Sequence, residues 1–338
     1  MNISILICTY NGSKKLKETL SYISNLTIPD KVMSVELVIV DNNSTDNTST
    51  FAKETWDAQT SKISIRVVNE SKGGKANALT TGYNASNGDL IVLCDDDNWL
   101  EKNYLVNVIS LFETNPEIGM AGGYGSSAIF EEKKPEWFDK FQFYFVVGKH
   151  HPNSGFLKNN DYSINGAGSV IRKKVWDKIY NAGFRFVNST TAGKAITEDI
   201  ELSMAVCFAG YKLYFDERLT FIHDLRWGRI DIDSLFLQEE MNGKGNVILY
   251  TYSTIYNLHQ NNKLTLLRFF IHYVKMIVIF ANELRKMNAN NNEHDNLEFR
   301  LAFTKKKSFL KHFVLHFISI LLKFQKISGW IKTVSDGK

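Results

Sequence analysis

The chain has 338 residues, of which 44% are hydrophobic and 22% charged, a composition that excludes fibrous, collagen-like and wholly disordered proteins. Its net charge of +4 combines a net −5 over residues 1–262 with a net +9 over residues 263–338. The length allows one large α/β domain with an appendage, or two domains.

The first 125 residues alternate short apolar runs with helical patterns. Strands are predicted at Ser4–Thr9, Glu36–Asp41, Ser64–Asn69, Asp89–Cys94 and Met120–Tyr124. Helices are predicted at Ser13–Leu26, Thr45–Gln59, Lys75–Ser86 and Tyr104–Thr114, with Ser44 as the N-cap of the second. Continuous Ile, Val and Leu strands separated by helices predict a mainly parallel sheet with helices on both faces.

After residue 125 the pattern becomes irregular and rich in aromatic residues up to about residue 162. Regular signals then return as strands at Ile164–Ile171 and Lys212–His223, and as helices from Lys173 and across Thr197–Ala209. Residues Ser234–His259 are predicted to be mostly helical with a break at Gly243–Gly245, and the Asn-rich segment Asn288–Asn296 to be a mobile loop.

Polar residues follow several of the predicted strands at the point where each strand ends. They include Thr9, Asn11, Asp41, Asn69 and the triplet Asp95–Asp97. Because open α/β sheets bind ligands at the carboxyl ends of their strands, these residues predict one active-site crevice.

The triplet Asp95-Asp96-Asp97 is the sharpest chemical signal in the chain. Three consecutive carboxylates repel one another unless a cation neutralises them, and Asp95 and Asp97 point the same way if the strand continues through them. They are then placed to share Mg²⁺ or Mn²⁺, which takes its remaining ligands from water and substrate phosphates. A solvated acidic turn is the alternative.

Two further motifs support the same reading less specifically. Ser71–Lys75 (SKGGK) opens a helix and offers backbone N–H groups and two cations to a phosphate, although a solvated glycine turn gives the same pattern. Glu198 and Asp199 lie at the start of a helix with Thr197 as its cap; they are either stabilised by the helix dipole or supply a general base.

In this order and spacing, the motifs resemble those of the inverting family 2 glycosyltransferases, which have the GT-A fold. The matching stretches are ILICTYNG (Ile5–Gly12), VIVDNNSTD (Val38–Asp46), NESKGGKANA (Asn69–Ala78), NGDLIVLCDDDNWL (Asn87–Leu100), NGAGSVIR (Asn165–Arg172) and EDIEL (Glu198–Leu202). The resemblance covers about residues 3–225. It implies a GT-A catalytic domain over residues 1–230, with a nucleotide-sugar half (1–125) and an acceptor half (126–230), followed by a helical region over 231–338.

The resemblance also implies roles for single residues. Five residues are assigned to donor binding. Thr9 and Asn11 line the nucleotide pocket, and Asp41 hydrogen-bonds the base. Lys75 lies near the donor, and Asp96 reaches the ribose or a metal-bound water. Asp97 binds a divalent metal, Mn²⁺ or Mg²⁺, and Asp95 supports it. Asn165–Gly168 lies under the transferred sugar and the acceptor. Asp199, the second residue of the Glu198–Asp199 pair, is the catalytic base.

The expected reaction is transfer of a sugar from a nucleotide-sugar, most simply a UDP-sugar, to a hydroxyl of a cell-surface polysaccharide or lipopolysaccharide acceptor. The carboxylate takes the proton of the hydroxyl and the metal stabilises the leaving diphosphate. Processive relatives carry QxxRW and membrane-spanning helices; this chain has His223-Asp-Leu-Arg-Trp227, which predicts one transfer per encounter. His223 is either a third metal or diphosphate ligand or a structural histidine.

Two other functions compete with this one. A nucleotide-sugar-binding protein of the same fold that has lost turnover is the first, and the intact acidic triplet and Asp199 argue against it. A dinucleotide-dependent oxidoreductase is the second, but no GxGxxG follows the first strand. The acidic body and the lack of a recognition motif argue against nucleic acid as a partner.

The basic C-terminal region is predicted to form amphipathic helices at Leu264–Ala281 and Ser308–Ser328. Such helices suit the headgroup region of an anionic membrane, or else pack on the catalytic domain or another subunit. No apolar run reaches the length of a spanning helix and no signal peptide is recognisable, and Cys8, Cys94 and Cys207 form no paired motif. We therefore expect a cytoplasmic protein, with peripheral contact to the inner face of the cytoplasmic membrane.

Overall fold

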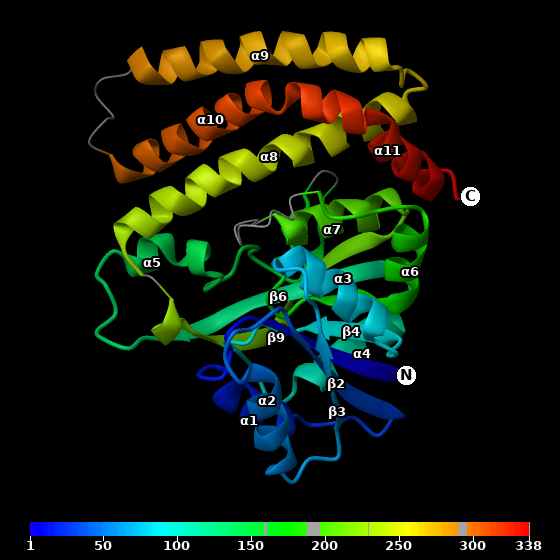
Figure 1. Cartoon of the computed structure of the whole chain (residues 1–338), viewed down its shortest axis with the longest axis vertical. Coiled ribbons are helices and arrows are strands. Elements are labelled where there is room, and N and C mark those ends of the chain that lie inside the picture. Colours follow the sequence, from blue (N-terminus) through cyan, green and yellow to red (C-terminus); the bar gives the residue numbers. More distant parts are fainter. Residues whose placement is uncertain (159–160, 188–196, 229, 290–295, 338) are drawn as a thin grey trace. The chain divides into compact units, whose positions relative to one another are not determined.

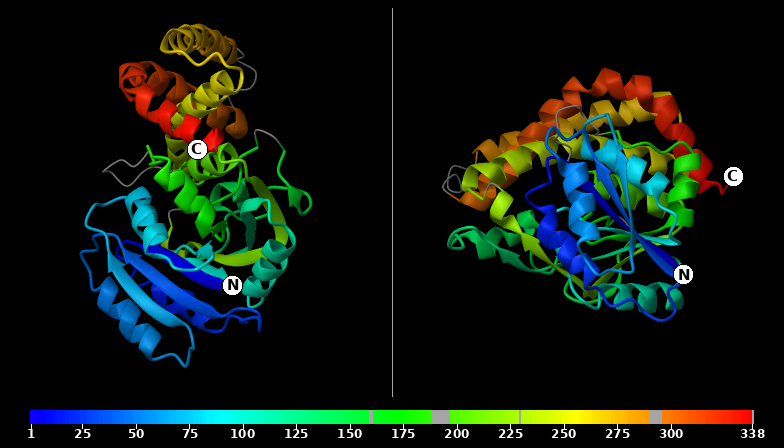
Figure 2. Two further views of the ribbon diagram at one scale, coloured as in Figure 1. Left: turned by 90° about the vertical axis from the view of Figure 1, so that its right-hand side faces the viewer. Right: turned by 60° about the horizontal axis from the view of Figure 1, so that its bottom comes forward.

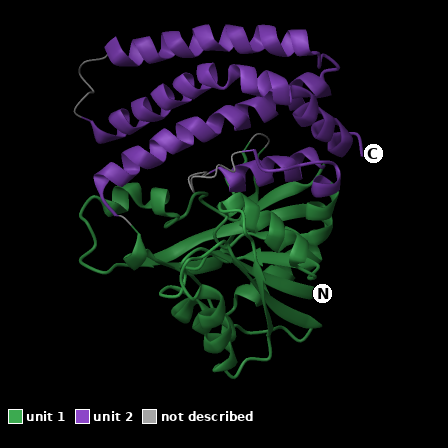
Figure 3. Ribbon diagram, in the orientation of Figure 1, with its two compact units in different colours: residues 1–178, 189–193, 210–229 green, residues 179–188, 194–209, 230–338 purple. Residues whose placement is uncertain are grey.

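The computed structural model describes residues 1–158, 161–187, 197–228, 230–289 and 296–337. The chain groups into two compact units (Figure 3). Apart from the residues outside the description, the first contains residues 1–178 and 210–229, and the second contains residues 179–188, 194–209 and 230–338. Unlike the domains predicted from the sequence, the units place residues 197–209 with the C-terminal helices.

Four parallel strands form one side of the sheet in the first unit (Figure 1). They are β1 (Asn2–Thr9), β2 (Ser34–Asp41), β3 (Ser64–Asn69) and β4 (Leu90–Leu93). Their register places Thr9 opposite Asp41 and Asp41 opposite Asn69, so the polar residues that end these strands lie in one row. The predicted parallel sheet is confirmed.

The other side of the sheet is mixed, and the strand order is β3-β2-β1-β4-β8-β6-β9-β5, with β7 paired to β9. These strands are β5 (Asn98–Leu100), β6 (Ile118–Ile129), β7 (Gly155–Phe156), β8 (Val170–Arg172) and β9 (Lys212–Asp224). Strand β8 runs antiparallel to β4 and β6, while β9 runs parallel to β6 and antiparallel to β5. The antiparallel pairing of β5 with β9 brings residue 98, next to the acidic triplet, opposite His223.

Helices cover both faces of this sheet, as the hydrophobic pattern predicts. They are α1 (Leu16–Ser24), α2 (Thr48–Asp57), α3 (Lys75–Ala85), α4 (Tyr104–Thr114) and α6 (Lys173–Asn181). Helices α1, α2 and α4 bury their apolar side chains in one core with Ile3, Ile5 and Ile7 of β1. Helix α3 packs on the opposite face, where Gly82 lies directly against Leu6. A sheet buried on both faces explains the continuous apolar runs.

The segment between β6 and β8 is mostly irregular, as predicted. Over residues 130–158 and 161–169, which the structure describes, its regular elements are the short helices α5 (Phe138–Phe141) and η1 (Gln142–Phe145) and strand β7. The strand predicted at Ile164–Ile171 is wrong over residues 164–169, because β8 begins only at Val170. Gly168 has a φ of 65°, and the Ser169 N–H donates to the Gly166 carbonyl, so a turn precedes β8. A positive φ is a conformation that glycine adopts readily and that a strand excludes.

The second unit is helical and contains α7 (Glu198–Phe208), α8 (Ile232–Gln260), α9 (Leu266–Ala289), α10 (Leu297–Leu315) and α11 (Phe317–Ser335). Figures 1 and 2 show α8, α9 and α10 running alongside one another. Of the predicted mobile loop, Asn288 lies in the last turn of α9, which ends at Ala289, and Asn296 caps α10; residues 290–295 lie outside the described residues.

The predicted break at Gly243–Gly245 is wrong, because α8 continues through both glycines. A Cβ on Gly243 would lie 2.3 Å from the carbonyl oxygen of Lys305, and one on Gly245 would lie 2.4 Å from Cγ2 of Thr197. The glycines therefore allow α10 and the start of α7 to approach α8 closely. Ser308 completes this contact by donating to the Glu240 carbonyl at 2.6 Å.

The predicted amphipathic helix Ser308–Ser328 is divided at His316, where α10 and α11 meet at a bend of 76°. Among the described residues no single helix combines the length and apolar composition of a membrane span, although the bent pair α10–α11 meets those two criteria when taken together.

Candidate active site

The acidic triplet lies in a turn between β4 and β5, at the edge where the parallel strands end. Strand β4 ends at Leu93, and the Asn98 N–H donates to the Asp95 carbonyl at 3.1 Å. The strand therefore does not continue through the triplet, and the expectation that Asp95 and Asp97 share an orientation by strand alternation is wrong. Instead, each of the three carboxylates contacts a different set of side chains.

Asp96 is the buried member of the triplet, with 8% of its surface exposed. Its Oδ2 accepts a hydrogen bond from Thr9 Oγ1 at 2.6 Å, and its main-chain carbonyl accepts one from Thr19 Oγ1 at 2.8 Å. Gly12 packs so closely here that a Cβ would lie 1.9 Å from Thr9 Oγ1. Burial and the neighbouring charge of Asp97 raise the pKa of Asp96 to about 6. Thr9 and Asp96, both assigned to the nucleotide, thus form one hydrogen-bonded unit.

Lys15 joins Asp96 to Asp97, and the sequence analysis missed it. Its Nζ lies 3.3 Å from Asp96 Oδ1 and 3.2 Å from Asp97 Oδ2. Burial lowers the pKa of Lys15, but the two carboxylates outweigh burial and raise the pKa well above its usual value. The available signal was its position: Lys15 follows the first predicted strand, at the same sheet edge as the triplet.

Asp97 and His223 lie together. The distance from His223 Nε2 to Asp97 Oδ1 is 3.6 Å, and His223 Nδ1 hydrogen-bonds the Phe145 carbonyl at 2.6 Å. Burial opposes ionisation of Asp97, but hydrogen bonding to His223 and the charges of His223 and Lys15 hold its pKa well below the usual range. Burial likewise lowers the pKa of His223, and Asp97 outweighs it, so the pKa of His223 is raised.

Lys75 begins α3 and pairs with the remaining carboxylate, its Nζ lying 3.1 Å from Asp95 Oδ1. The main chain at Gly74, with a φ of 119°, is fixed by a hydrogen bond from its N–H to Asn42 Oδ1 at 2.7 Å. The SKGGK segment is therefore attached to the end of β2 and places a cation against the triplet.

The predicted metal ligands Asp95, Asp97 and His223 are only partly brought together. Asp97 and His223 are neighbours, whereas Asp95 is held by Lys75. Within the part of the chain that the structure describes, no three His, Cys, Asp or Glu side chains are arranged to hold a metal ion. The donor chemistry of Asp97 and His223 fits an open site, in which a divalent cation takes its other ligands from phosphate and water.

The other predicted nucleotide residues lie at the ends of two neighbouring strands: Asp41 is the last residue of β2, and Asn11 follows β1. Asp41 accepts hydrogen bonds from the Ser44 N–H at 3.0 Å and from the Ser49 hydroxyl. Asn11, with a φ of 51°, donates its N–H to Ser44 Oγ at 2.9 Å. Ser44 is thus wrong as a helix N-cap, a position that Asn47 occupies. It joins the ends of β1 and β2 instead.

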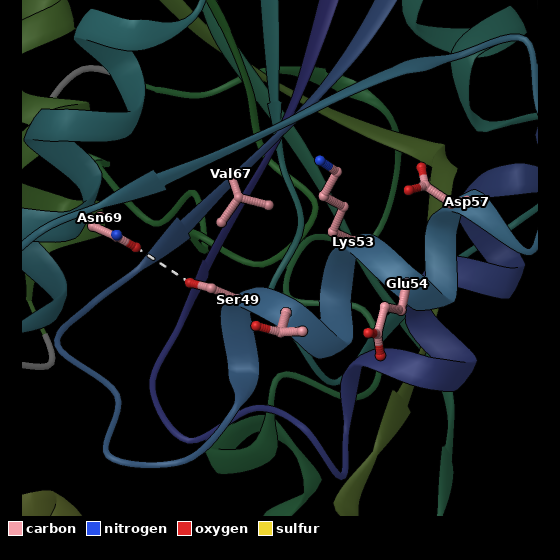
Figure 4. A pocket seen from close by; sticks show the side chains of 7 residues that line it. Ser49, Lys53, Glu54, Asp57, Val67 and Asn69 are labelled. Carbon is pink, nitrogen blue, oxygen red and sulfur yellow. Dashed lines mark hydrogen bonds between the residues drawn. The ribbon is translucent and has the colours of Figure 1, made fainter.

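A cavity of about 430 Å³ lies beside Asp41, between α2 and β3 (Figure 4). Ser49, which donates to Asp41, lies at its rim and also contacts Asn69 at 3.2 Å. Lys53, Glu54 and Asp57 of α2 line it further. None of the residues that line the cavity belongs to the triplet. The cavity reaches Asn69, the last residue of β3, and so lies at the end of the strand next to β2.

The predicted sugar-binding loop Asn165–Gly168 is a buried turn in the same unit. The Tyr104 hydroxyl, itself fully buried, donates to the Gly168 carbonyl. The Leu93 N–H donates to the Ser169 carbonyl at 2.7 Å, which ties this loop to the end of β4 and hence to the triplet. Tyr104 is a second residue that sequence reasoning missed, because a tyrosine opening an apolar helix reads as core.

Glu198 and Asp199 lie in the first turn of α7, with Thr197 at the N-cap position, as predicted. They belong to the second unit. Glu198 is buried, and Asp199 Oδ1 accepts from the Ile200 N–H at 2.8 Å. Glu201, one turn on, fixes the helix by accepting from the Val187 N–H at 2.9 Å and the Tyr252 hydroxyl at 3.2 Å. The role of Asp199 as base stays a prediction.

Comparison with known proteins agrees with these features. The sequence model described as "Glycosyl transferase family 2" matches residues 4–180. A poly-beta-1,6-N-acetyl-D-glucosamine synthase of Staphylococcus epidermidis is 31% identical over 121 residues, which are 36% of this chain and 28% of the relative. The alignments span about a third of the length of the first curated relatives.

Solved structures show the same fold at low sequence identity. S. aureus TarS 1–349 superposes with a TM-score of 0.51 at 12% identity, covering 94% of this chain and 92% of that one. TarS 1–349 in complex with UDP-GlcNAc superposes with a TM-score of 0.50 at the same identity and coverage. The predicted fold class, a mainly parallel GT-A sheet followed by a helical C-terminal region, is confirmed.

Proposed function

The chain belongs to glycosyl transferase family 2, and we propose that it moves a sugar from a nucleotide-sugar donor to an acceptor hydroxyl with inversion at the anomeric carbon. The acidic cluster at the strand ends carries this proposal. It gathers Asp95, Asp96 and Asp97 with the cations Lys15 and Lys75 inside the region that the family model matches. Such a cluster suits a nucleoside diphosphate, since it offers both cations and carboxylates for a bridging metal.

We propose a UDP-sugar as the donor. Asp41 ends β2 with its carboxylate held by Ser44 and Ser49, and each of its oxygens keeps a further lone pair that accepts the imide N–H of uracil. Lys15 and Lys75, which pair with the triplet, offer two cations to a diphosphate bound there. The complex of TarS with UDP-GlcNAc supports this choice of nucleotide.

A divalent cation, Mn²⁺ or Mg²⁺, is part of the proposal, with Asp97 and His223 as its protein ligands. When bound, it stabilises the charge that develops on the leaving diphosphate. The ion pair of Asp95 with Lys75 holds the adjoining turn. Lys15 orients Asp97 by contacting its Oδ2, while His223 faces its Oδ1.

Asp199 is proposed as the general base. A sugar hydroxyl is a poor nucleophile at neutral pH, so a carboxylate must accept its proton as the glycosidic bond forms. Asp199 stands in the first turn of α7, a helix fixed through Glu201, and Glu198 beside it completes the acidic pair. No covalent enzyme intermediate is required for inversion.

We propose a growing cell-surface polysaccharide or lipopolysaccharide unit as the acceptor, modified once per encounter in the cytoplasm. The S. epidermidis relative is named a polysaccharide synthase, which supports a saccharide acceptor. The sequence HDLRW at residues 223–227 in place of QxxRW favours single transfer. A nucleotide-sugar-binding protein without turnover is the alternative.

Release of UDP from a panel of UDP-sugars, with Mn²⁺ or Mg²⁺ and saccharide acceptors, tests the proposal. Asp199→Asn should lower transfer by about a thousandfold, the middle of the range for loss of a general base, and leave UDP affinity unchanged. Asp177→Asn, a change of the same kind in α6, is the matched control and should leave transfer as in the wild type. Binding of UDP without transfer in the wild type would favour the alternative.

A further inference from the structure

Helix α9 exposes an apolar face to solvent. Leu267, Ile271 and Val278 are 68%, 57% and 58% exposed, and Val274 lies between them on the same side of the helix. The opposite side carries Phe269, which is fully buried and packs on Phe324 of α11 at a ring distance of 5.1 Å. Helix α9 therefore packs in the second unit through one apolar face and exposes a second apolar face to solvent.

The exposed face continues across the bend between α10 and α11. The ring of Phe270 lies 5.5 Å from the ring of Phe317, which starts α11. Next to Phe317, Ile318 is 70% exposed, and Leu322 one turn later is 81% exposed. We call these residues together the apolar surface: Leu267, Phe270, Ile271, Val274, Val278, Val314, Leu315, Ile318 and Leu322. A contiguous exposed patch of this kind marks a site of interaction with a protein or a membrane.

Cations and no acids accompany the apolar surface. Exposed basic side chains occur on all three helices: Arg268 and Lys275 on α9, Lys307 and Lys311 on α10, and Lys323 and Lys326 on α11. Residues 263–282 and 299–335, which contain the whole apolar surface, have no Asp or Glu. The complementary partner is therefore both apolar and anionic.

We propose that the apolar surface docks on an anionic phospholipid bilayer, with α9 and the bend between α10 and α11 lying in the headgroup region. Bulky aliphatic side chains then enter the acyl boundary while Lys275, Lys311 and Lys323 meet lipid phosphates. A second copy of the chain is the poorer match, because it brings two surfaces of the same positive sign together. Nucleic acid offers the negative charge but nothing for the aliphatic side chains.

Docking at a bilayer is independent of the transfer reaction, since no residue of the apolar surface belongs to the proposed catalytic machinery. The positively charged C-terminal region can attract an anionic bilayer, whereas residues 1–262, with a net charge of −5, would be repelled by it. Docking also brings the enzyme to the surface where a lipid-linked acceptor would be found.

Flotation of the full chain with vesicles tests the proposal. The protein should float with vesicles of equal parts phosphatidylcholine and phosphatidylglycerol, and at least about tenfold less with phosphatidylcholine alone, because each lysine near an anionic surface contributes severalfold. The double variants Leu267→Asp/Ile271→Asp and Lys275→Glu/Lys311→Glu should each lower flotation by about tenfold or more. Met33→Asp, at a position 82% exposed in the first unit, is the matched control and should float like the wild type.

Circular dichroism shows whether each variant is folded, and sedimentation velocity without lipid reports self-association. Failure of the wild type to float with anionic vesicles would overturn the proposal. So would equal flotation of Leu267→Asp/Ile271→Asp and Met33→Asp. A wild-type dimer that this double variant dissociates, with no flotation, would assign the apolar surface to a second copy instead. None of these outcomes depends on finding the sugar donor or acceptor.

Discussion

Replacing Lys15 with methionine tests the charge balance of the acidic cluster. The change keeps the aliphatic part of the side chain and removes the ammonium group that lies 3.3 Å from Asp96 and 3.2 Å from Asp97. Loss of one partner from a fully buried ion pair costs about 3–5 kcal/mol. Because the Lys15 side chain is 27% exposed, water replaces part of the attraction, and we expect a loss of about 2 kcal/mol at pH 8.

The pH dependence distinguishes this effect from lost packing. Asp96 has a raised pKa of about 6, so its ionisation destabilises the folded state as the pH rises from about 4 to 6. Without Lys15 the pKa of Asp96 rises further, and the loss of folding stability that accompanies its ionisation continues toward pH 8. At pH 5 Asp96 is mostly protonated in both proteins. The difference in free energy of unfolding between wild type and Lys15→Met should therefore be about half of its value at pH 8.

Urea unfolding followed by tryptophan fluorescence, in EDTA at pH 5 and pH 8, measures both values. Lys14→Met is the matched control, since Lys14 is the exposed neighbour of Lys15. We expect Lys14→Met to change the free energy of unfolding by less than about 0.5 kcal/mol. If Lys15→Met lowers the free energy of unfolding no more than Lys14→Met at pH 8, or by the same amount at both pH values, Lys15 does not balance the charge of the cluster.

Three further changes have defined outcomes. Asp97 raises the pKa of His223, so wild type should be more stable than His223→Gln below about pH 6.5, and this advantage should decline as the pH rises above that value in urea titrations. A difference that does not change with pH would contradict this. Gly243→Ala should lower the free energy of unfolding by about 1–3 kcal/mol through its contact with α10, whereas Gly329→Ala, which meets open space, should raise it by about 0.5–1 kcal/mol. Asn98→Leu should raise the unfolding free energy by about 1 kcal/mol, because the Asn98 amide is fully buried without a partner among the described residues; destabilisation would show that it is satisfied.

Local pattern was sufficient to predict the parallel half of the sheet. Strand β3 and helix α4 begin and end at the predicted residues. In both, polar residues bound the apolar run, and the spacing of the apolar residues matches the strand or helix that forms. The row of strand ends followed from the parallel arrangement alone. Thr9, Asp41 and the triplet therefore lie at one edge, as predicted.

The errors arise where long-range contacts decide the local structure. Gly243 reads as a helix break in sequence but serves the close approach of α10, a contact between residues 62 positions apart. The division at His316 cannot be seen in an amphipathic pattern that runs through it. Lys15 escaped notice because a lysine at a helix start is ordinarily solvated, and only the fold shows that the turn at Asp96–Asp97 meets it.

Calorimetric titration of UDP into the wild-type chain with Mn²⁺, compared with ADP and with Asp97→Asn, measures whether the acidic cluster and the end of β2 bind a uridine diphosphate donor. We expect micromolar UDP binding, at least about tenfold weaker binding of ADP, and loss of the Mn²⁺ dependence in Asp97→Asn. Failure of UDP to bind with either Mn²⁺ or Mg²⁺, or equal Mn²⁺-dependent binding by Asp97→Asn, would contradict this expectation.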